Sequence, residues 1–200
     1  MGIIERKQRQ KDDTRLRIVD AALKIGKEHG WNALSMRRIG DIIEYSAPIV
    51  YEYFSNKDAL LIELIRMGYR KLVKQLKAIN KSHESPVKQI EALWQVYWDF
   101  AFAEREFYQL MFGIDTSCAC HTLRLPEAEQ PEALISEAIR RLLPNRENTD
   151  EKVSELYYTF WSIVHGLISL NMVRADIPKS LNGQVLTSAL SGVFRSIATD

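Results

Sequence analysis

The chain has 200 residues, of which 46% are hydrophobic, and a formal net charge of +1 at pH 7. This length and composition can bury a real core and suggest one or two compact domains. No apolar run approaches membrane-spanning length, and the charged N-terminus MGIIERKQRQKDD is unlike a secretory signal, so we expect a cytoplasmic protein without a membrane partner.

Charge is distributed unevenly along the chain. Residues 1–40 hold ten Lys and Arg against five acidic residues, a net charge of +5, which leaves −4 for the rest. A basic end on an acidic body suits a DNA-binding head on a regulatory body, although tails and solvated faces also collect charge. Residues 1–13 lack apolar periodicity, so we expect a mobile arm there. It is either a plain disordered terminus or a contact to phosphates or the minor groove through Arg6, Lys7 and Arg9.

A helix is predicted from Thr14 to Gly30. Asp13 or Thr14 can cap its start, and Gly30 is a typical helix-stop residue. The residues predicted to form its apolar face recur at helical spacing: Leu16, Ile18, Val19, Ala22, Leu23, Ile25 and Gly26.

The stretch SMRRIGDIIEYSAPIVYEYFSNK, residues 35–57, predicts two short helices separated by a tight turn. In the first, about Ser35 to Ile43, the serine is the cap and the buried residues are Met36, Ile39, Ile42 and Ile43. In the second, about Ala47 to Phe54, Pro48 lies in the first turn, where the amide it removes has no helical partner. Val50, Tyr51 and Phe54 are expected to pack inward. The residues left on the outer side are Ser46, Ala47, Ile49 and Tyr53.

A short helix braced by a packed base, with positive charge beside it, is how a helix-turn-helix enters the DNA major groove. The candidate phosphate contacts are Ser35, Arg37, Ser46, Tyr53 and Lys57. Arg37 is also the better candidate for a hydrogen-bonded base contact, and Arg38 is expected to be a solvated surface residue. Apolar contacts to bases, such as a thymine methyl group, are open to Ala47, Pro48 and Ile49.

At these residues the chain resembles the tetracycline-repressor (TetR) family of one-component bacterial transcription regulators. The similarity runs from the helix TRLRIVDAALKIGKEHG through the residues Trp31, Leu34, Ser35, Arg37, Ile39, Ser46, Val50, Tyr51, Tyr53, Phe54, Lys57 and Leu60. It implies phosphate contacts by Tyr51, Tyr53 and Lys57. Two positions depart from the family: Gly40 stands where alanine is usual, and Glu44 stands in the turn where glycine is usual.

Further helices are predicted at about Lys57 to Asn80, Val87 to Ala103, Glu104 to Phe112, Pro131 to Leu143, Glu151 to Arg174 and Leu181 to Ile197. The expected fold is therefore all-α with about nine helices. A helix-turn-helix DNA-binding domain would occupy residues 1–56, and a helical effector-binding and dimerisation domain would occupy residues 57–200.

The segment from Ile114 to Pro131 is expected to be a long connection and holds both cysteines, Cys118 and Cys120, next to His121. Thiolates and imidazole are ligands for zinc or copper, but this set offers only three ligands with no second cluster. Two free thiols are the default in a cytoplasmic protein, so we expect neither a metal site nor any cofactor.

The last two helices each carry a strip of small residues. These strips consist of Ser162, Gly166 and Ser169, and of Ala189, Gly192 and Ser196. They predict a self-association surface, unless they pack only within one subunit. The resemblance implies a homodimer through a C-terminal four-helix bundle, and one short recognition helix contacts too few base pairs alone.

Aromatic residues crowd three segments of the C-terminal part. The candidate effector-binding residues are Trp94, Trp98, Phe102, Phe107, Met111, Tyr157, Trp161 and His165. Such crowding also forms plain core, and His165 is either a hydrogen-bonded core residue or a ligand-facing one. The sequence WSIVHGL around it resembles a Trp-His-Gly pattern of one TetR subgroup.

The leading interpretation is a ligand-responsive regulator, a homodimeric repressor of a palindromic double-stranded DNA operator that a small apolar or aromatic effector releases. Activation instead of repression depends on operator placement. The alternatives are a non-specific DNA-associated structural protein, or an enzyme with His165 as base. We find no catalytic constellation or cofactor loop, and expect no enzyme.

Overall fold

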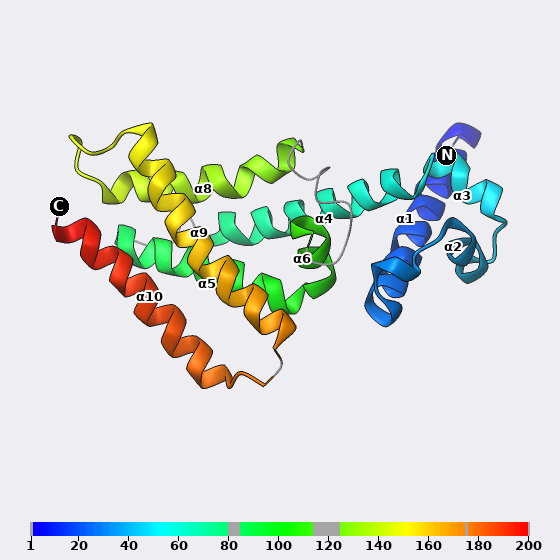
Figure 1. Ribbon diagram of the computed structural model, residues 1–200. Coiled ribbons are helices and arrows are strands. Elements are labelled where there is room, and N and C mark those ends of the chain that lie inside the picture. Colours follow the sequence, from blue (N-terminus) through cyan, green and yellow to red (C-terminus); the bar gives the residue numbers. More distant parts are fainter. Residues whose placement is uncertain (1, 80–84, 114–124, 175, 200) are drawn as a thin grey trace. The chain divides into compact units, whose positions relative to one another are not determined.

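The computed structural model describes residues 2–79, 85–113, 125–174 and 176–199 and shows only helices in them, as predicted (Figure 1). The helices are α1 (Ile3–His29), the single 3-10 turn η1 (Trp31–Ala33), α2 (Met36–Ile43), α3 (Ala47–Tyr53), α4 (Lys57–Ile79), α5 (Pro86–Ala103), α6 (Arg105–Phe112), α8 (Pro126–Leu142), α9 (Asp150–Val173) and α10 (Lys179–Thr199). The chain forms two compact units. The first unit comprises residues 1–68 and 106–124, and the second unit comprises residues 69–105 and 125–200.

The first unit is built on α1, against which η1 and α2 pack, while α3 packs on α2. Its fully buried side chains come from α1, α2, α3 and the start of α4: Ile18, Ala22, Ile39, Val50, Leu60 and Leu64. Ile18, Ala22 and Ile25 recur at helical spacing and are buried together, because residues three and four apart share one face.

The N-terminal segment is helical from Ile3 on, so the mobile arm predicted at residues 1–13 is wrong for residues 3–13. α1 begins at Ile3, where the Glu5 carboxylate accepts a hydrogen bond from the Gly2 amide at 3.0 Å. Gln8 also donates to Asp12 at 2.9 Å, one turn further on. Helix propagation needs no apolar face once a turn exists, so these exposed turns continue the buried part of α1.

In α1 and α2, two residues predicted to be buried are exposed instead. Leu16 is 56% exposed and Ile42 is 41% exposed. The buried faces of α1 and α2 are narrower than the sequence predicts, because each helix packs along one line of contact. Apolar residues at the edge of that stripe remain in water.

Close packing around two glycines fixes the base of the first unit. A Cβ at Gly26 would lie 2.6 Å from the Trp31 ring, whose Nε1 donates to the Glu106 carbonyl at 3.2 Å. A Cβ at Gly68 in α4 would lie 2.6 Å from Met111 Sδ in α6. Helix α6 therefore belongs to the base on which the first unit is assembled.

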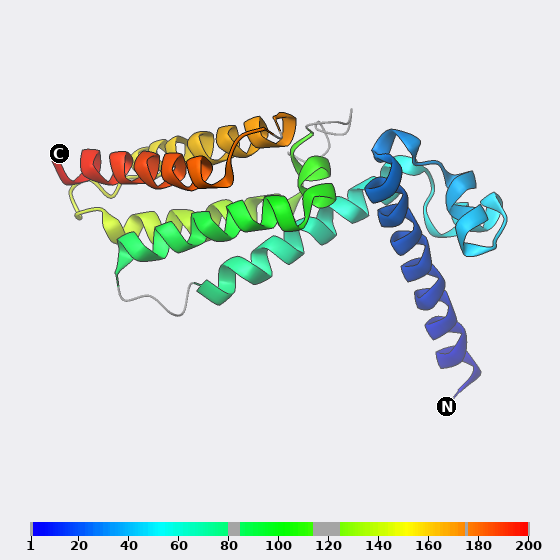
Figure 2. The same ribbon diagram turned by 90° about the horizontal axis from the view of Figure 1, so that it is seen from below.

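In the second unit, α5, α8 and α9 pack on one another and α10 packs on α9 (Figure 2). The predicted helix at residues 87–103, apolar nearly all round, becomes α5, whose buried residues include Leu93, Trp94, Tyr97 and Phe100. Such a helix is stable only inside a bundle.

Helix α8 begins at Pro126, so the predicted start at Pro131 is wrong, and residues 126–131, predicted to belong to the long connection, are helical. Pro126 occupies the first turn, and Glu127 and Glu129 follow it there, where carboxylates interact favourably with the helix dipole. Pro131 lies inside the helix. The carbonyl that it leaves without an amide partner belongs to Glu127, still within the first turn.

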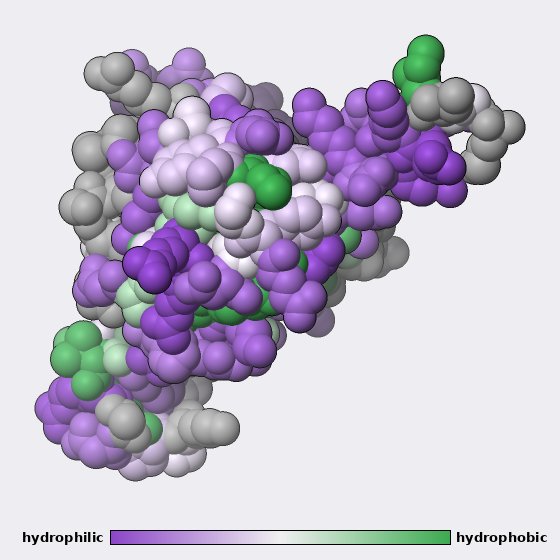
Figure 3. Space-filling model, turned by 90° about the vertical axis from the view of Figure 1, so that its right-hand side faces the viewer, coloured by the Kyte–Doolittle hydropathy of each residue, from purple (hydrophilic) through white to green (hydrophobic). Residues whose placement is uncertain are grey.

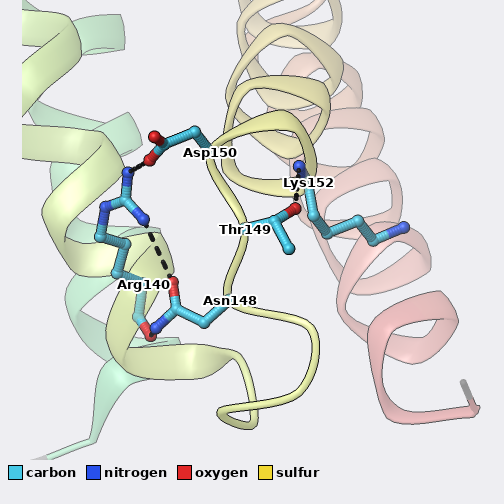
Figure 4. A network of polar contacts seen from close by, with 5 residues as sticks. All are labelled: Arg140, Asn148, Thr149, Asp150 and Lys152. Carbon is cyan, nitrogen blue, oxygen red and sulfur yellow. Dashed lines mark hydrogen bonds and ion pairs between the residues drawn. The ribbon is translucent and has the colours of Figure 1, made fainter.

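A small polar network fixes the connection between α8 and α9 (Figure 4). The Arg140 guanidinium forms an ion pair with Asp150 and donates to Asn148 Oδ1 at 3.3 Å, and the Asn148 amide donates back to the Arg140 carbonyl at 3.1 Å. Thr149 Oγ1 accepts from the Lys152 amide at 3.2 Å, which caps α9. The turn thus holds α8 and α9 as neighbours.

The surfaces of α9 and α10 around Gly166 and Gly192 are open among the described residues. A Cβ added at Gly166 or Gly192 would meet no heavy atom of the described residues within 4 Å. Two apolar residues near the end of α9 are also exposed, Leu170 to 57% and Val173 to 79%. A reciprocal amide pair between Asn171 and Asn182 joins the two helices near their connection.

Across the described ranges, each helix is either too short or too polar to span a lipid bilayer.

Candidate nucleic-acid interface and effector site

Helix α2 starts as predicted at a serine cap. Ser35 Oγ accepts a hydrogen bond from the Arg38 amide at 3.2 Å. Met36, Ile39 and Ile43 are buried. Arg37, on the other side of the helix, is exposed.

The turn after α2 places opposite steric demands on Gly40 and Glu44. Glu44 adopts the left-handed conformation with φ 63° and ψ 37°, the only positive φ among the described non-glycine residues. The Tyr45 amide donates to the Gly40 carbonyl at 2.9 Å, which folds the chain back so closely that a Cβ at Gly40 would lie 2.6 Å from the Tyr45 carbonyl oxygen. A side chain at residue 40 would therefore force the Tyr45 carbonyl to move, while the turn itself carries a strained glutamate.

Helix α3 is held by its inner side only. Val50 and Phe54 are buried, as predicted. Tyr51 is 51% exposed, so the prediction that it packs inward is wrong, because one residue after Val50 the helix has turned by about 100°. The other predicted contact residues on α3 and at its start are solvent-accessible: Ser46 and Pro48 are exposed, and Ala47, Ile49 and Tyr53 are half-buried.

Basic residues of α1 brace this motif. Arg17 donates to the Ile43 carbonyl at 2.7 Å, at the C-terminal end of α2 where a cation is favourable. Arg15 lies over the Phe54 ring at 4.4 Å from its centroid and forms an ion pair with Glu63 at 3.4 Å. From the sequence, both arginines are apparent only as part of the positive charge of residues 1–40. The possible signal was their position beside the buried stripe of α1.

Lys57 forms a hydrogen bond within the first unit. Its Nζ donates to the Trp31 carbonyl at 3.3 Å, which links the start of α4 to η1. Asn56 caps α4 by accepting from the Ala59 amide at 2.7 Å. An ammonium group has three donors, so the bond to Trp31 leaves Lys57 able to contact a further acceptor.

In the second unit, an aromatic cluster surrounds the buried Trp94. The Trp94 ring lies 5.6 Å from the Tyr97 ring, 6.1 Å from Tyr157 and 6.2 Å from Phe160, between centroids. Trp94 Nε1 is buried, and no hydrogen-bond acceptor lies within reach of it among the described residues. Burial raises the pKa of Tyr157 and raises that of Tyr69 to about 12, so both phenols are neutral near pH 7.

A second group in this unit forms a chain of hydrogen bonds. Trp161 Nε1 donates to the Tyr97 hydroxyl at 3.0 Å, and the Tyr97 oxygen lies 3.3 Å from His165 Nδ1. Burial lowers the pKa of His165, so its imidazole is neutral near pH 7. Because the Tyr97 oxygen accepts from Trp161, the Tyr97 hydroxyl proton can be donated to an unprotonated Nδ1 of His165. His165 therefore has the hydrogen-bonded partner expected of a core histidine.

The remaining candidate effector residues are divided between the units. Trp98 packs on Phe102, with ring centroids 4.9 Å apart, and Phe102 is 41% exposed at the surface of the second unit. Phe107 and Met111 belong to the first unit, where both lie close to Gly68. The structure thus gathers Trp94, Tyr157, Trp161 and His165 in the second unit.

Two family models match this chain. The model described as "Bacterial regulatory proteins, tetR family" matches residues 18–64, and the model described as "Tetracyclin repressor-like, C-terminal domain" matches residues 90–178. Together they cover more than half of the chain. It belongs to the TetR family. The resemblance drawn from the residues of the helix-turn-helix is confirmed.

Two curated relatives match part of the chain. The HTH-type transcriptional activator FasR of Mycolicibacterium smegmatis is 24% identical over 105 residues, 52% of this chain and 48% of FasR. The HTH-type transcriptional regulator BetI of Rhizobium meliloti is 31% identical over 126 residues, 63% of this chain and 55% of BetI. The chain spans about half the length of the curated relatives it matches.

Solved structures share the TetR fold. The TetR family transcriptional regulator PfmR of Thermus thermophilus has a TM-score of 0.65 and 18% identity, over 90% of this chain and 97% of PfmR. SmeT, solved as a complex with triclosan, has a TM-score of 0.66 and 19% identity, over 90% of this chain and 91% of SmeT.

The cysteine motif falls outside the described ranges, since Cys118, Cys120 and His121 lie within residues 114–124. Among the residues that are described, no group of three or more His, Cys, Asp or Glu side chains is placed to hold a metal ion.

Proposed function

We propose that this TetR-family protein is a DNA-binding transcription regulator that acts in the cytoplasm as a homodimer. Residues 1–56 would contact a palindromic operator, and residues 57–200 would dimerise and bind a small effector. The observation that carries the proposal is α3, whose inner side is anchored by Val50 and Phe54 while Ser46, Pro48 and Tyr51 face solvent. A short helix presented in this way fits a major groove.

Two kinds of DNA contact follow from this placement. Phosphate contacts by Ser35, Ser46, Tyr51, Tyr53 and Lys57 would fix the register of the motif on the duplex. Base contacts would come from Arg37, which is exposed on α2 and can donate to guanine, and from apolar contacts by Ala47, Pro48 and Ile49.

We propose repression as the direction of control, with an effector that releases the protein from its operator. The name of the relative FasR describes an activator, and activation would follow here if the operator lies where bound protein recruits polymerase. The effector's leverage equals its differential affinity for the two dimer geometries. We propose no enzymatic activity, since the family is one of regulatory proteins.

The effector site that we propose centres on Trp94 in the second unit, with Tyr157, Trp161 and His165 close by and Trp98 and Phe102 near the surface. A buried donor without an acceptor costs about 1–3 kcal/mol. An aromatic or apolar effector carrying a hydrogen-bond acceptor would satisfy Trp94 Nε1. The triclosan complex of SmeT supports the proposal of an aromatic effector. The sequence WSIVHGL supports the proposal that the protein belongs to the Trp-His-Gly subgroup.

DNA binding is tested by selecting bound duplexes from a random pool with the wild-type protein and with Arg37→Ala and Tyr53→Phe variants. Loss of a phosphate contact at Tyr53 should weaken all sequences alike, and loss of a base contact at Arg37 should relax one position of the selected site. Steep salt dependence without any sequence preference would instead indicate a non-specific DNA-associated protein. A monomeric protein that ignores every duplex at low salt would exclude both.

Effector binding is tested by thermal unfolding against a panel of aromatic compounds, each paired with an analogue that lacks the acceptor. Acceptor-bearing compounds should stabilise the wild type more than their analogues, and this difference should disappear in Trp94→Phe but persist in Trp98→Phe. The absence of stabilisation or of tryptophan-fluorescence quenching across the panel would overturn the proposed site.

A further inference from the structure

The exposed N-terminal turns of α1 lie beside the recognition helix α3 within the first unit. Residues 4–13 of α1 are exposed and include Arg6, Lys7, Arg9 and Lys11. On the side of the molecule shown in Figure 3, the surface is mostly hydrophilic and its hydrophobic residues form small, separate patches. A surface of this kind suits a polar, charged partner.

A hollow of about 480 Å³ separates these turns from α3. Its lining residues come from α1, from the turn before α3 and from α3 itself: Lys7, Gln10, Lys11, Thr14, Tyr45, Glu52 and Tyr53. Lys7, Lys11 and Thr14 follow one another at helical spacing and so share one face of α1. The two lysines are about 6 Å apart along the helix axis.

The lysines of the hollow differ from the arginines further along α1. Arg15 and Arg17 are engaged with Glu63, Phe54 and the Ile43 carbonyl, and they hold the motif together. Neither Lys7 nor Lys11 has an ion-pair partner in the part of the chain that the structure describes. Their charge is therefore not used to stabilise this unit.

We propose that the hollow holds a backbone phosphate of duplex DNA at the edge of the groove that α3 enters. Lys7 and Lys11 supply the positive charge, and Gln10 and Tyr53 supply neutral donors. This inference rests on the proposed DNA binding and extends the contact surface beyond the helix-turn-helix. The hollow is open and its lysines are flexible, so binding requires the polyanionic duplex and the release of its counterions, and free phosphate does not suffice.

Glu52 allows a test of how charge in the hollow changes the affinity for DNA. Its carboxylate is the single acid among the lining residues and opposes a phosphate in the hollow. Removing this charge should therefore strengthen binding to every duplex, whereas removing the lysine charges should weaken it.

The test compares two double variants by fluorescence anisotropy at several KCl concentrations, with a mixed-sequence duplex and with the duplex that the wild type selects from a random pool. In Lys7→Gln, Lys11→Gln, the slope of log K against log [KCl] should become shallower by about 0.9 for each phosphate that the lysines no longer neutralise. Binding should weaken on both duplexes, and reselection should return the same sequence. Inorganic phosphate should not raise the thermal stability of the wild type.

The matched control is Arg6→Gln, Arg9→Gln, which removes the same charge from the same turns at positions outside the hollow. The slope of log K against log [KCl] should change by less than half as much in this control as in the lysine double variant. Equal effects of the two double variants, or an unchanged slope in the lysine variant with its helix content intact, would overturn the proposal. If the wild type binds neither duplex at low salt, the proposed DNA binding fails instead.

Glu52→Gln completes the design. Uniformly tighter binding to both duplexes supports a phosphate in the hollow. A relaxed preference at one base pair, without uniform strengthening, would place Glu52 against a base edge and overturn the assignment of the hollow to the backbone.

Discussion

In the turn between α2 and α3, Gly40 and Glu44 occupy positions with opposite steric requirements. Glu44 takes a left-handed conformation that a side chain adopts at a cost, and Gly40 lies where a Cβ would meet the Tyr45 carbonyl oxygen. A glycine at residue 44 would therefore relieve strain, and an alanine at residue 40 would create it.

We expect Glu44→Gly to raise the free energy of unfolding by about 0.5–1 kcal/mol. Relief of the left-handed conformation gains about 1–2 kcal/mol, and the added freedom of glycine in the unfolded chain returns about 0.5–1 kcal/mol of it. Gly40→Ala, the paired variant, should lower the free energy of unfolding by roughly 1–3 kcal/mol because the carbonyl must move. Urea denaturation measures both, and a destabilised Glu44→Gly would show that the turn is not strained.

His165 makes the second unit sensitive to acid. Burial holds the pKa of the folded-state imidazole below its ordinary value, so the folded state binds fewer protons than the unfolded chain. The contribution of the neutral His165 imidazole to the free energy of unfolding is fully present above about pH 6.5. It is lost as the pH falls through the lowered pKa. Protonated Nδ1 can no longer accept from the Tyr97 hydroxyl.

Between pH 7 and pH 5, the wild type should lose more thermal stability than His165→Gln, which has no titratable group there. Tyr97→Phe is the companion variant. It should be less stable at pH 7, because Trp161 Nε1 and His165 both lose the Tyr97 hydroxyl as a hydrogen-bond partner. Its stability should still depend on pH, because the His165 imidazole is still present and titrates. Parallel stability curves for the wild type and His165→Gln would contradict the assigned role of the imidazole.

The elements that the sequence predicts well are those with strong local signals. α2 has a serine cap and three buried residues at helical spacing, and α3 is delimited by Ser46 and Phe54, so local rules place both. α1 and α8 start earlier than predicted. The first turns of α1 have no apolar stripe to indicate a helix, and α8 contains a second proline that also resembles a helix start.

The candidate sites depend on contacts that no local pattern encodes. Arg15 and Arg17 brace the helix-turn-helix through residues 26 or more positions away, and the buried position of Trp94 Nε1 depends on how α5 and α9 meet. Sequence spacing places such residues on a helix face, and tertiary packing alone determines their neighbours. The sequence predicts the aromatic set at residues 94–165 as a group, but it does not predict the division of that set between two units.

Association of two copies is expected at the open faces of α9 and α10. Gly192→Arg should convert the dimer to a monomer and abolish operator binding, because a long charged side chain would enter the helix interface. Gly183→Arg is the control on the same helix. The Gly183→Arg variant introduces the same side chain nine residues before Gly192, on the opposite face of α10, where an added Cβ also meets open space.

Sedimentation velocity distinguishes these outcomes. A dimeric Gly192→Arg protein with wild-type DNA affinity would rule out the proposed interface, and two monomeric variants would show that the arginine acts through something other than the open strip. Circular dichroism should be unchanged in both, since a Cβ added at either glycine would meet no other heavy atom of the described chain within 4 Å.

The first unit is assembled from two separate stretches of chain, because α6 returns to it after α5. Trp31 takes its acceptor from Glu106, and Gly68 is closed over by Met111. A hybrid of two relatives joined by a single crossover near residue 56 would therefore combine the N-terminal helices of one protein with the α6 of the other. Those helices would then lack the α6 against which they pack in their own protein. A functional hybrid should need α6 and the beginning of α4 to travel with the donor's N-terminal helices.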